Sequence, residues 1–61
     1  MEEKFIVCDD YVKVQNFIND VFPGIHTKIV YDGVSYLLAV YLETDLEFVL
    51  LNSYLIAKGV I

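Results

Sequence analysis

Few residues of this chain have the side chains and the spacing that catalysis or metal binding requires. The one cysteine, Cys8, stands beside Asp9 and Asp10, and the one histidine is His26. Nucleophilic catalysis needs a nucleophile, a base and an orienting group within hydrogen-bond reach of one another. These residues match no recognised spacing of metal ligands, and no Gly-rich phosphate loop is present. We therefore expect no enzyme activity, no catalytic residue, no metal site and no cofactor.

Structural roles account for the same residues. Cys8 ends a short β-type run, residues 4–8, and is expected to be a buried, reduced thiol that behaves as a small hydrophobic residue. Asp9 or Asp10 is a favourable N-cap, because a carboxylate accepts hydrogen bonds from the free backbone N–H groups of a first helical turn. These side chains are thus expected to position elements rather than to react.

Hydrophobic spacing predicts two helices. Apolar residues between positions 14 and 21 recur at i, i+3, i+4 and i+7, the spacing of one helical face, and Pro23 follows as a helix breaker. Thr44 and Glu47 form a capping box, which predicts that a second helix begins there. This helix is expected to run to about Lys58, where a glycine follows.

Residues 25–42 predict a β-hairpin around Asp32-Gly33. The dipeptide suits a two-residue type I′ turn, in which both central residues have positive φ. Such a turn places Tyr31 opposite Val34. One face of the hairpin is then nearly all apolar, whereas the other is mixed and carries His26, Lys28, Val30, Leu37, Ala39 and Tyr41.

The predicted order is β-α-β-β-α within a single domain, residues 1–61. A right-handed crossover makes the first strand parallel to the second, and the third strand, apolar on both faces, belongs between them. We therefore predict an α+β fold: a three-stranded antiparallel sheet in the order 1-3-2 with two helices on one face. The arrangement is that of a ferredoxin-like fold without its fourth strand, and both outer strands are open edges.

Composition indicates a protein partner. Hydrophobic residues make up 57% of the chain, although a domain this small has little interior in which to bury them. The longest apolar run, Tyr36–Leu42, is too short to span a membrane, and the first residues resemble no secretory signal. The four lysines are scattered and the net charge is −5, so direct nucleic-acid binding is not expected. We expect a cytoplasmic protein with an acidic surface that favours a basic protein partner.

The second predicted helix is apolar on two sides. One side runs from Leu46 to Ala57, and nearly opposite lie Phe48, Leu51 and Leu55. One side must pack on the sheet, while the other contacts either the first helix or an associating molecule.

We expect a partner-binding surface with an apolar centre and an acidic rim. The hairpin tip, the mixed sheet face and the second helix all contribute to it. The predicted contact residues are Tyr31, Asp32, Leu37, Tyr41, Glu43, Glu47, Phe48, Leu51 and Leu55.

The chain resembles the small T-even-phage antitoxins of the Dmd type. The features that carry the resemblance are its length, its acidity, its many residues with AT-rich codons, its lack of catalytic residues and the order of its elements. These antitoxins neutralise a host RNase toxin of the RnlA type. The resemblance implies a phage-encoded inhibitor that acts in the host cytoplasm and blocks an RNase toxin.

The sequence is compatible with two main classes of function. In the first, the chain is a non-catalytic acidic module that inhibits a basic protein. In the second, it is a homo-oligomeric structural or regulatory domain whose surplus apolar surface covers itself across a two-fold axis. An inhibitor would be a monomer or a weak homodimer before it meets its partner. A small-molecule-binding regulatory domain is a third possibility, although no ligand-binding motif supports it.

Overall fold

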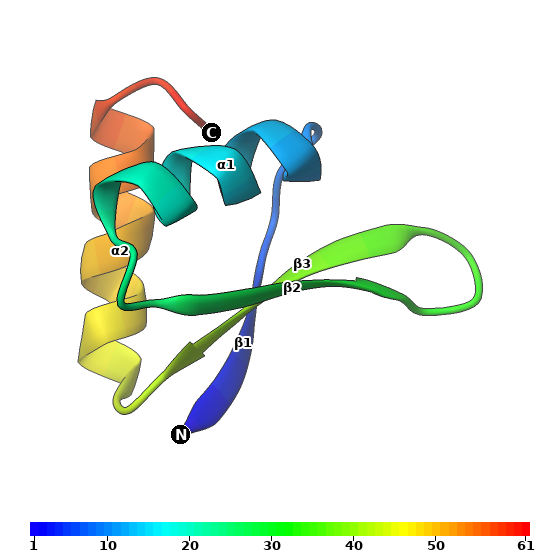
Figure 1. Ribbon diagram of the computed structural model, residues 1–61, viewed down its shortest axis with the longest axis horizontal. Coiled ribbons are helices and arrows are strands. Elements are labelled where there is room, and N and C mark those ends of the chain that lie inside the picture. The colour runs from blue at the N-terminus through cyan, green and yellow to red at the C-terminus, as the bar shows by residue number, and fades with distance from the viewer.

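A central strand, β3 (Tyr36–Leu42), organises the sheet. In a computed structural model that describes all 61 residues, β1 (Glu2–Ile6) and β2 (His26–Tyr31) flank β3, and both pairs are antiparallel. Helices α1 (Tyr11–Val21) and α2 (Asp45–Ala57) complete the order β-α-β-β-α (Figure 1). The predicted α+β fold with strand order 1-3-2 is confirmed.

Both helices cover the same face of the sheet. Side chains alternate between the faces of a strand, so Leu38, Val40 and Leu42 of β3 share one side, and all three are buried. In Figure 1, α1 lies above the strands and α2 along their left side. The core is one cluster of eight buried residues from all elements but β2: Ile6, Val14, Ile18, Leu38, Val40, Leu42, Leu51 and Leu55.

β1 begins and ends two residues earlier than the predicted run at residues 4–8. Its register pairs Glu2 with Leu42 and Ile6 with Leu38, so that the strand reaches the C-terminal end of β3. Beyond Ile6 the chain leaves the sheet and crosses to α1, which leaves Val7 92% exposed. The sequence pattern did not indicate that β1 begins at Glu2, because the first residues of the strand are charged. An edge strand tolerates such residues, whereas a central strand does not.

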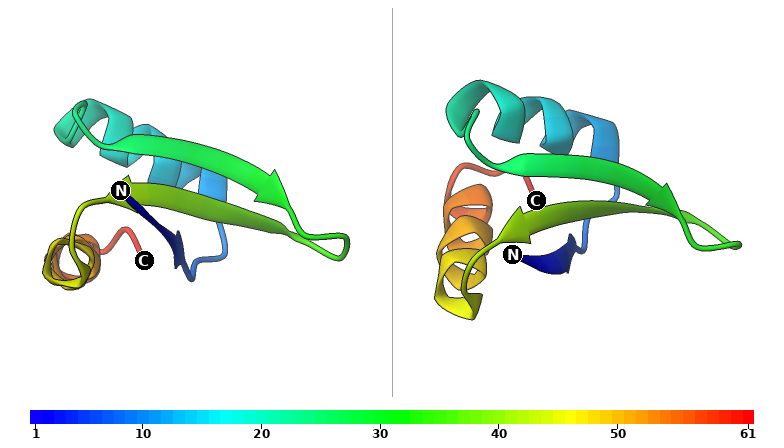
Figure 2. Two further views of the ribbon diagram at one scale, coloured as in Figure 1. Left: turned by 90° about the horizontal axis from the view of Figure 1, so that it is seen from below. Right: turned by 60° about the horizontal axis from the view of Figure 1, so that its bottom comes forward.

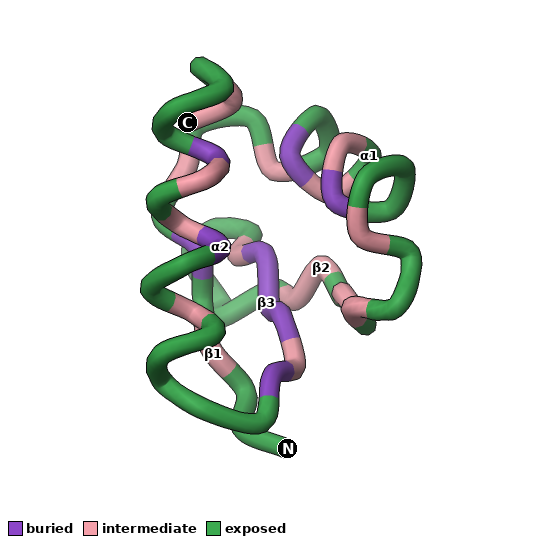
Figure 3. Tube along the Cα trace, turned by 90° about the vertical axis from the view of Figure 1, so that its left-hand side faces the viewer, coloured by how far each residue is buried: buried purple, intermediate pink, exposed green.

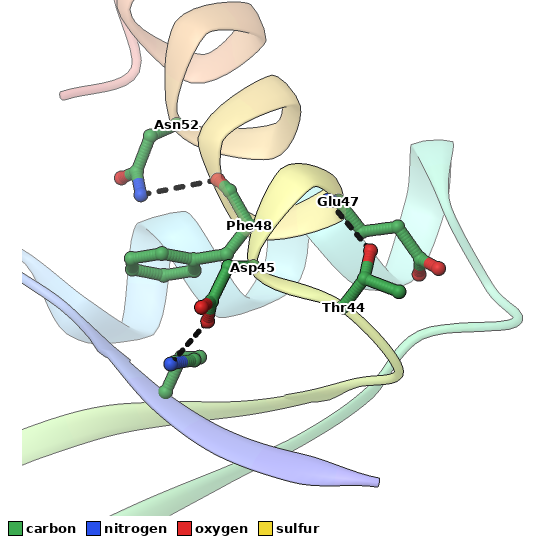
Figure 4. Close-up of polar contacts among 6 residues, drawn as sticks. Thr44, Asp45, Glu47, Phe48 and Asn52 are labelled. Carbon is green, nitrogen blue, oxygen red and sulfur yellow. Dashed lines mark hydrogen bonds and ion pairs between the residues drawn. The ribbon is translucent and has the colours of Figure 1, made fainter.

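Both helices begin at predicted cap residues. The Asp10 side chain accepts a hydrogen bond from the Lys13 N–H at 3.0 Å, and Thr44 Oγ1 accepts one from the Glu47 N–H at 3.2 Å (Figure 4). Only this half of the expected capping box forms. The Glu47 carboxylate does not bond back to the Thr44 backbone, and it takes part in no other hydrogen bond or ion pair.

The C-terminal end of α2 is closed by a Schellman motif. Gly59 has a φ of 71°, the left-handed conformation that glycine adopts without steric cost. Its N–H donates to the Ile56 carbonyl, and the Val60 N–H donates to the Leu55 carbonyl at 2.9 Å. Val60 then packs against the core, so the last residues fold back over the helices.

The hairpin turn differs from the predicted type I′ turn. Tyr31 pairs with Tyr36 instead of Val34, a shift of two residues that leaves each side chain on its predicted face. Among the turn residues only Gly33 has positive φ, whereas a type I′ turn requires it at Asp32 as well. The physical reason is that the Asp32 carboxylate accepts the Val34 and Ser35 N–H groups, both at 2.8 Å, and so holds a longer loop.

Candidate protein-binding interface

One side of α2 has no covering element. Four of its large hydrophobic residues are 56–66% exposed, whereas the opposite side of the helix enters the core. In Figure 3 the outer turns of α2 are drawn as exposed, next to the buried β3. An exposed apolar patch of this kind is typical of an interaction site. We name this surface the α2 outer face; it comprises Leu46, Val49, Leu50, Ser53, Ile56 and Ala57.

Three of the four predicted contact residues on α2, the hydrophobic ones, lie on the side that faces the core, whereas Glu47 is exposed. Leu51 is 5% exposed and Leu55 fully buried, and the half-buried Phe48 packs against the same core. These side chains face the sheet and offer little surface to a partner of the folded chain. The sequence does not separate the two sides, because both carry large hydrophobic residues at helical spacing.

Carboxylates gather at the end of the molecule where α2 begins. The register of β1 places its first residues beside Tyr41 and Leu42, from which the chain continues into α2. Two of the predicted contact residues, Glu43 and Glu47, lie here and are exposed. We name this group, which holds five of the nine acidic residues, the acidic end; it comprises Glu2, Glu3, Glu43, Asp45 and Glu47.

One lysine is tied into the acidic end. Lys4 Nζ forms an ion pair with the carboxylate of Asp45, which lies in the first turn of α2. This hydrogen-bonded contact raises the pKa of Lys4. The ion pair links edge strand β1 to α2, and it leaves the glutamates of the acidic end without a cationic partner.

Leu37 and Tyr41, also predicted contacts, lie on the sheet face opposite the helices. The Tyr41 hydroxyl donates to Glu3 Oε2 at 2.7 Å, which raises the Tyr41 pKa, and the His26 ring lies 5.1 Å from the Tyr41 ring. Phe5 of β1, 42% exposed, adds an aromatic side chain that sequence reasoning missed because the strand register was unknown. This face is a second exposed surface, separated from the α2 outer face by the sheet.

Tyr31 and Asp32 lie at the hairpin tip, which extends well beyond both helices (Figure 2). The Tyr31 hydroxyl donates to the Gly33 carbonyl, and its ring packs 5.1 Å from that of Tyr36. Backbone N–H groups of the turn lower the pKa of Asp32. The two residues thus stabilise the turn, far from the acidic end, and the nine predicted residues do not form one surface.

The residues with potential chemistry lie apart. Cys8 follows edge strand β1, whereas His26 begins the opposite edge strand β2. Partial burial and the nearby Asp9 and Asp10 raise the pKa of the Cys8 thiol, which leaves less of the nucleophilic thiolate at neutral pH. No three side chains of His, Cys, Asp or Glu gather as a metal site would need, and neither helix has the length and hydropathy to cross a membrane.

Comparisons with protein-family models, with curated protein sequences and with solved structures found no match. A functional proposal therefore rests on the chemistry of the surfaces themselves. The α2 outer face with the adjoining acidic end is the strongest of them, because it joins exposed apolar residues to concentrated charge.

Proposed function

We propose that this chain is a non-catalytic, acidic protein-binding module that inhibits a basic partner protein, and that it binds this partner with the α2 outer face and the acidic end. The observation that carries the proposal is the exposure of four large hydrophobic residues beside five carboxylates. An apolar centre with a charged rim is the usual composition of a protein interface.

The free energy that the apolar residues supply is at best little more than the cost of association. Full burial of a large apolar side chain contributes about 1.5–3 kcal/mol, so four residues that are still 56–66% exposed supply roughly 4–7 kcal/mol. The loss of translational and rotational freedom on association costs about 4–15 kcal/mol. Charged contacts must therefore add to the apolar ones, which favours a partner that is basic where it meets the acidic end.

An RNase is a suitable partner class for such a surface. A protein that binds RNA carries clustered cations to neutralise phosphates, and an acidic inhibitor that occupies these cations competes directly with RNA. This agrees with the resemblance to Dmd-type antitoxins, whose target is an RNase toxin. The proposal places the chain in the cytoplasm, in that of the host cell if a phage encodes it.

A capture experiment with an activity readout tests the proposal. The tagged chain is incubated with bacterial lysate at low and moderate salt, bound proteins are identified by mass spectrometry, and the RNase activity of the captured protein is measured with and without the chain. We expect one stoichiometric basic protein whose activity is inhibited and whose association slows as salt rises. A Leu46→Ser/Leu50→Ser variant should lose capture, whereas Val34→Ser, at an even more exposed position of the hairpin tip, should retain it.

The spacing of the α2 outer face favours one alternative, a homodimer. Leu46, Val49, Ser53 and Ile56 are separated by three and four residues, as in the seam of a two-helix coiled coil. In an antiparallel pair, Lys58 of one copy approaches the acidic end of the second copy. A dimer mass by sedimentation at low protein concentration would support the homo-oligomer, and a monomer mass would support the inhibitor.

A further inference from the structure

A groove of about 420 Å³ runs along α2 beside the α2 outer face. Leu50 belongs to both surfaces, so the groove is continuous with the proposed interface. Of its seven lining residues, six are hydrophobic and one is a carboxylic acid. We name it the Glu47 groove; it is lined by Phe22, Ile25, Leu42, Glu47, Leu50, Leu51 and Tyr54.

The single charge of the groove has no partner within the chain. The Glu47 carboxylate makes no hydrogen bond and no ion pair. In Figure 4 it projects from the side of α2 away from Asp45, toward the segment that joins α1 to β2, which contributes Phe22 and Ile25 to the groove. The nearest lysine in the sequence, Lys58, is held with Nζ 5.5 Å from the Tyr54 ring and does not line the groove.

We propose that the Glu47 groove binds an arginine side chain of the basic partner, with the guanidinium on Glu47 and the aliphatic stem along the apolar walls. This inference rests on the proposed function and names the chemistry of the contact. A purely apolar occupant would take the Glu47 carboxylate out of water without a compensating partner. A cation at the end of an apolar stem satisfies both the carboxylate and the walls.

The aromatic walls favour arginine over lysine. Phe22 and Tyr54 both line the groove with ring centroids 5.1 Å apart, and because Lys58 Nζ lies over the Tyr54 ring, Phe22 is the ring without a cation over it. A planar guanidinium stacks on aromatic faces, is weakly hydrated, and pairs with a carboxylate through two parallel N–H bonds. An ammonium group is more strongly hydrated and pairs as a point charge. Arginine is also enriched at the energetic centres of interfaces.

A peptide titration tests this inference without the natural partner. The probe is acetyl-Gly-Arg-Gly-amide, and the matched control is the same peptide with citrulline, which is neutral but nearly the same shape. Binding is followed by NMR through the signals of Ile25, Leu42 and Leu50. We expect the arginine peptide to shift these signals with an affinity at least about tenfold above that of the citrulline peptide, the ratio typical of a charge-assisted hydrogen bond.

Two variants with the same change of charge locate the contact. Glu47→Gln should reduce binding of the arginine peptide to the level of the citrulline peptide, whereas Glu43→Gln, in the acidic end but outside the groove, should leave it within about twofold. Equal binding of both peptides, equal effects of both variants, or shifts confined to other residues would overturn the inference. So would the absence of shifts at millimolar peptide.

The experiments distinguish failure of the arginine site from failure of the proposed inhibitor function. If the peptide binds as expected but lysate yields no inhibited basic protein, the groove is an arginine site and the inhibitor role fails. If a basic protein is captured and inhibited equally well by the wild type and by Glu47→Gln, the inhibitor role stands and the arginine site fails.

Discussion

The two helices cover the same sheet face but distribute their hydrophobic residues differently. In α1, Val14 and Ile18 are fully buried, and most of the opposite side is polar. In α2, Leu51 and Leu55 are buried, but the opposite side of this helix is hydrophobic as well. The first pattern is that of a helix which serves only its own core, whereas a helix that is apolar all round normally has a second contact. The difference supports the proposal that both helices contribute to the core, whereas α2 alone also contributes an association surface.

The largest expected effect distinguishes the two sides of α2. Leu55→Ala should destabilise the fold by about 2–5 kcal/mol, as should Ile18→Ala in α1, because each change leaves a cavity among fully buried side chains. Leu46→Ala and Leu50→Ala should change stability by less than about 0.5 kcal/mol, since both residues are at least 60% exposed. Urea unfolding measures all four.

The outer-face variants are the control for this comparison. If Leu46→Ala and Leu50→Ala destabilised the chain as strongly as Leu55→Ala, and more so at high protein concentration, the α2 outer face would be buried between copies of the chain. The homodimer would then replace the inhibitor as the best explanation of the exposed residues.

A smaller effect is expected at the helix caps. Asp10→Ala and Thr44→Ala each remove a side-chain acceptor of one backbone N–H group and should destabilise the chain by about 1 kcal/mol. Thermal unfolding followed by circular dichroism gives the comparison. Asp10→Asn and Thr44→Ser retain the acceptor and should keep nearly the full stability. A loss in these conservative variants equal to that of the alanine variants would contradict the capping role.

The smallest expected effect is a difference between the two helices in how the stability of their first turns depends on pH. The pKa of Lys4 is raised above 10.5 by its contact with Asp45, so the pair contributes fully below the unfolded pKa and is lost as the pH rises through the higher folded value. The first turn of α2 should therefore loosen in strongly alkaline solution before the first turn of α1. Lysine side-chain NMR measures the titration, and chemical shifts of Glu47 and Lys13 report the two turns. Lys4→Met should abolish the difference; its persistence would exclude the ion pair as the cause.

Much of the fold was predictable because local and long-range signals agree. The caps Asp10 and Thr44 mark helix starts by side-chain chemistry alone, and β3 had to be central because it is apolar on both faces. The turn was not predictable from its dipeptide, since the Asp32 side chain captures two amides and changes the loop.

The interface was less predictable than the fold. Both sides of α2 suit a core, and only the packing of the sheet decides that Leu55 lies inside and Leu50 outside. The Glu47 groove was also hidden, because Phe22 and Ile25 come from a segment remote in sequence and meet α2 only in the folded chain.

The two outer strands of the sheet, β1 and β2, are open to pairing with a further strand. β1 and β2 each leave one row of backbone groups unpaired, which is a template for growth by a further strand. Lys4 and Lys28 lie near the middle of these strands, opposite Val40 and Ala39 of β3. Strand addition at the β2 edge would bring the Lys28 ammonium close to the incoming chain, whereas the Lys4 ammonium of β1 is held by Asp45 of α2. Lys28, exposed on edge strand β2, is thus the kind of charged residue that opposes pairing with a further strand.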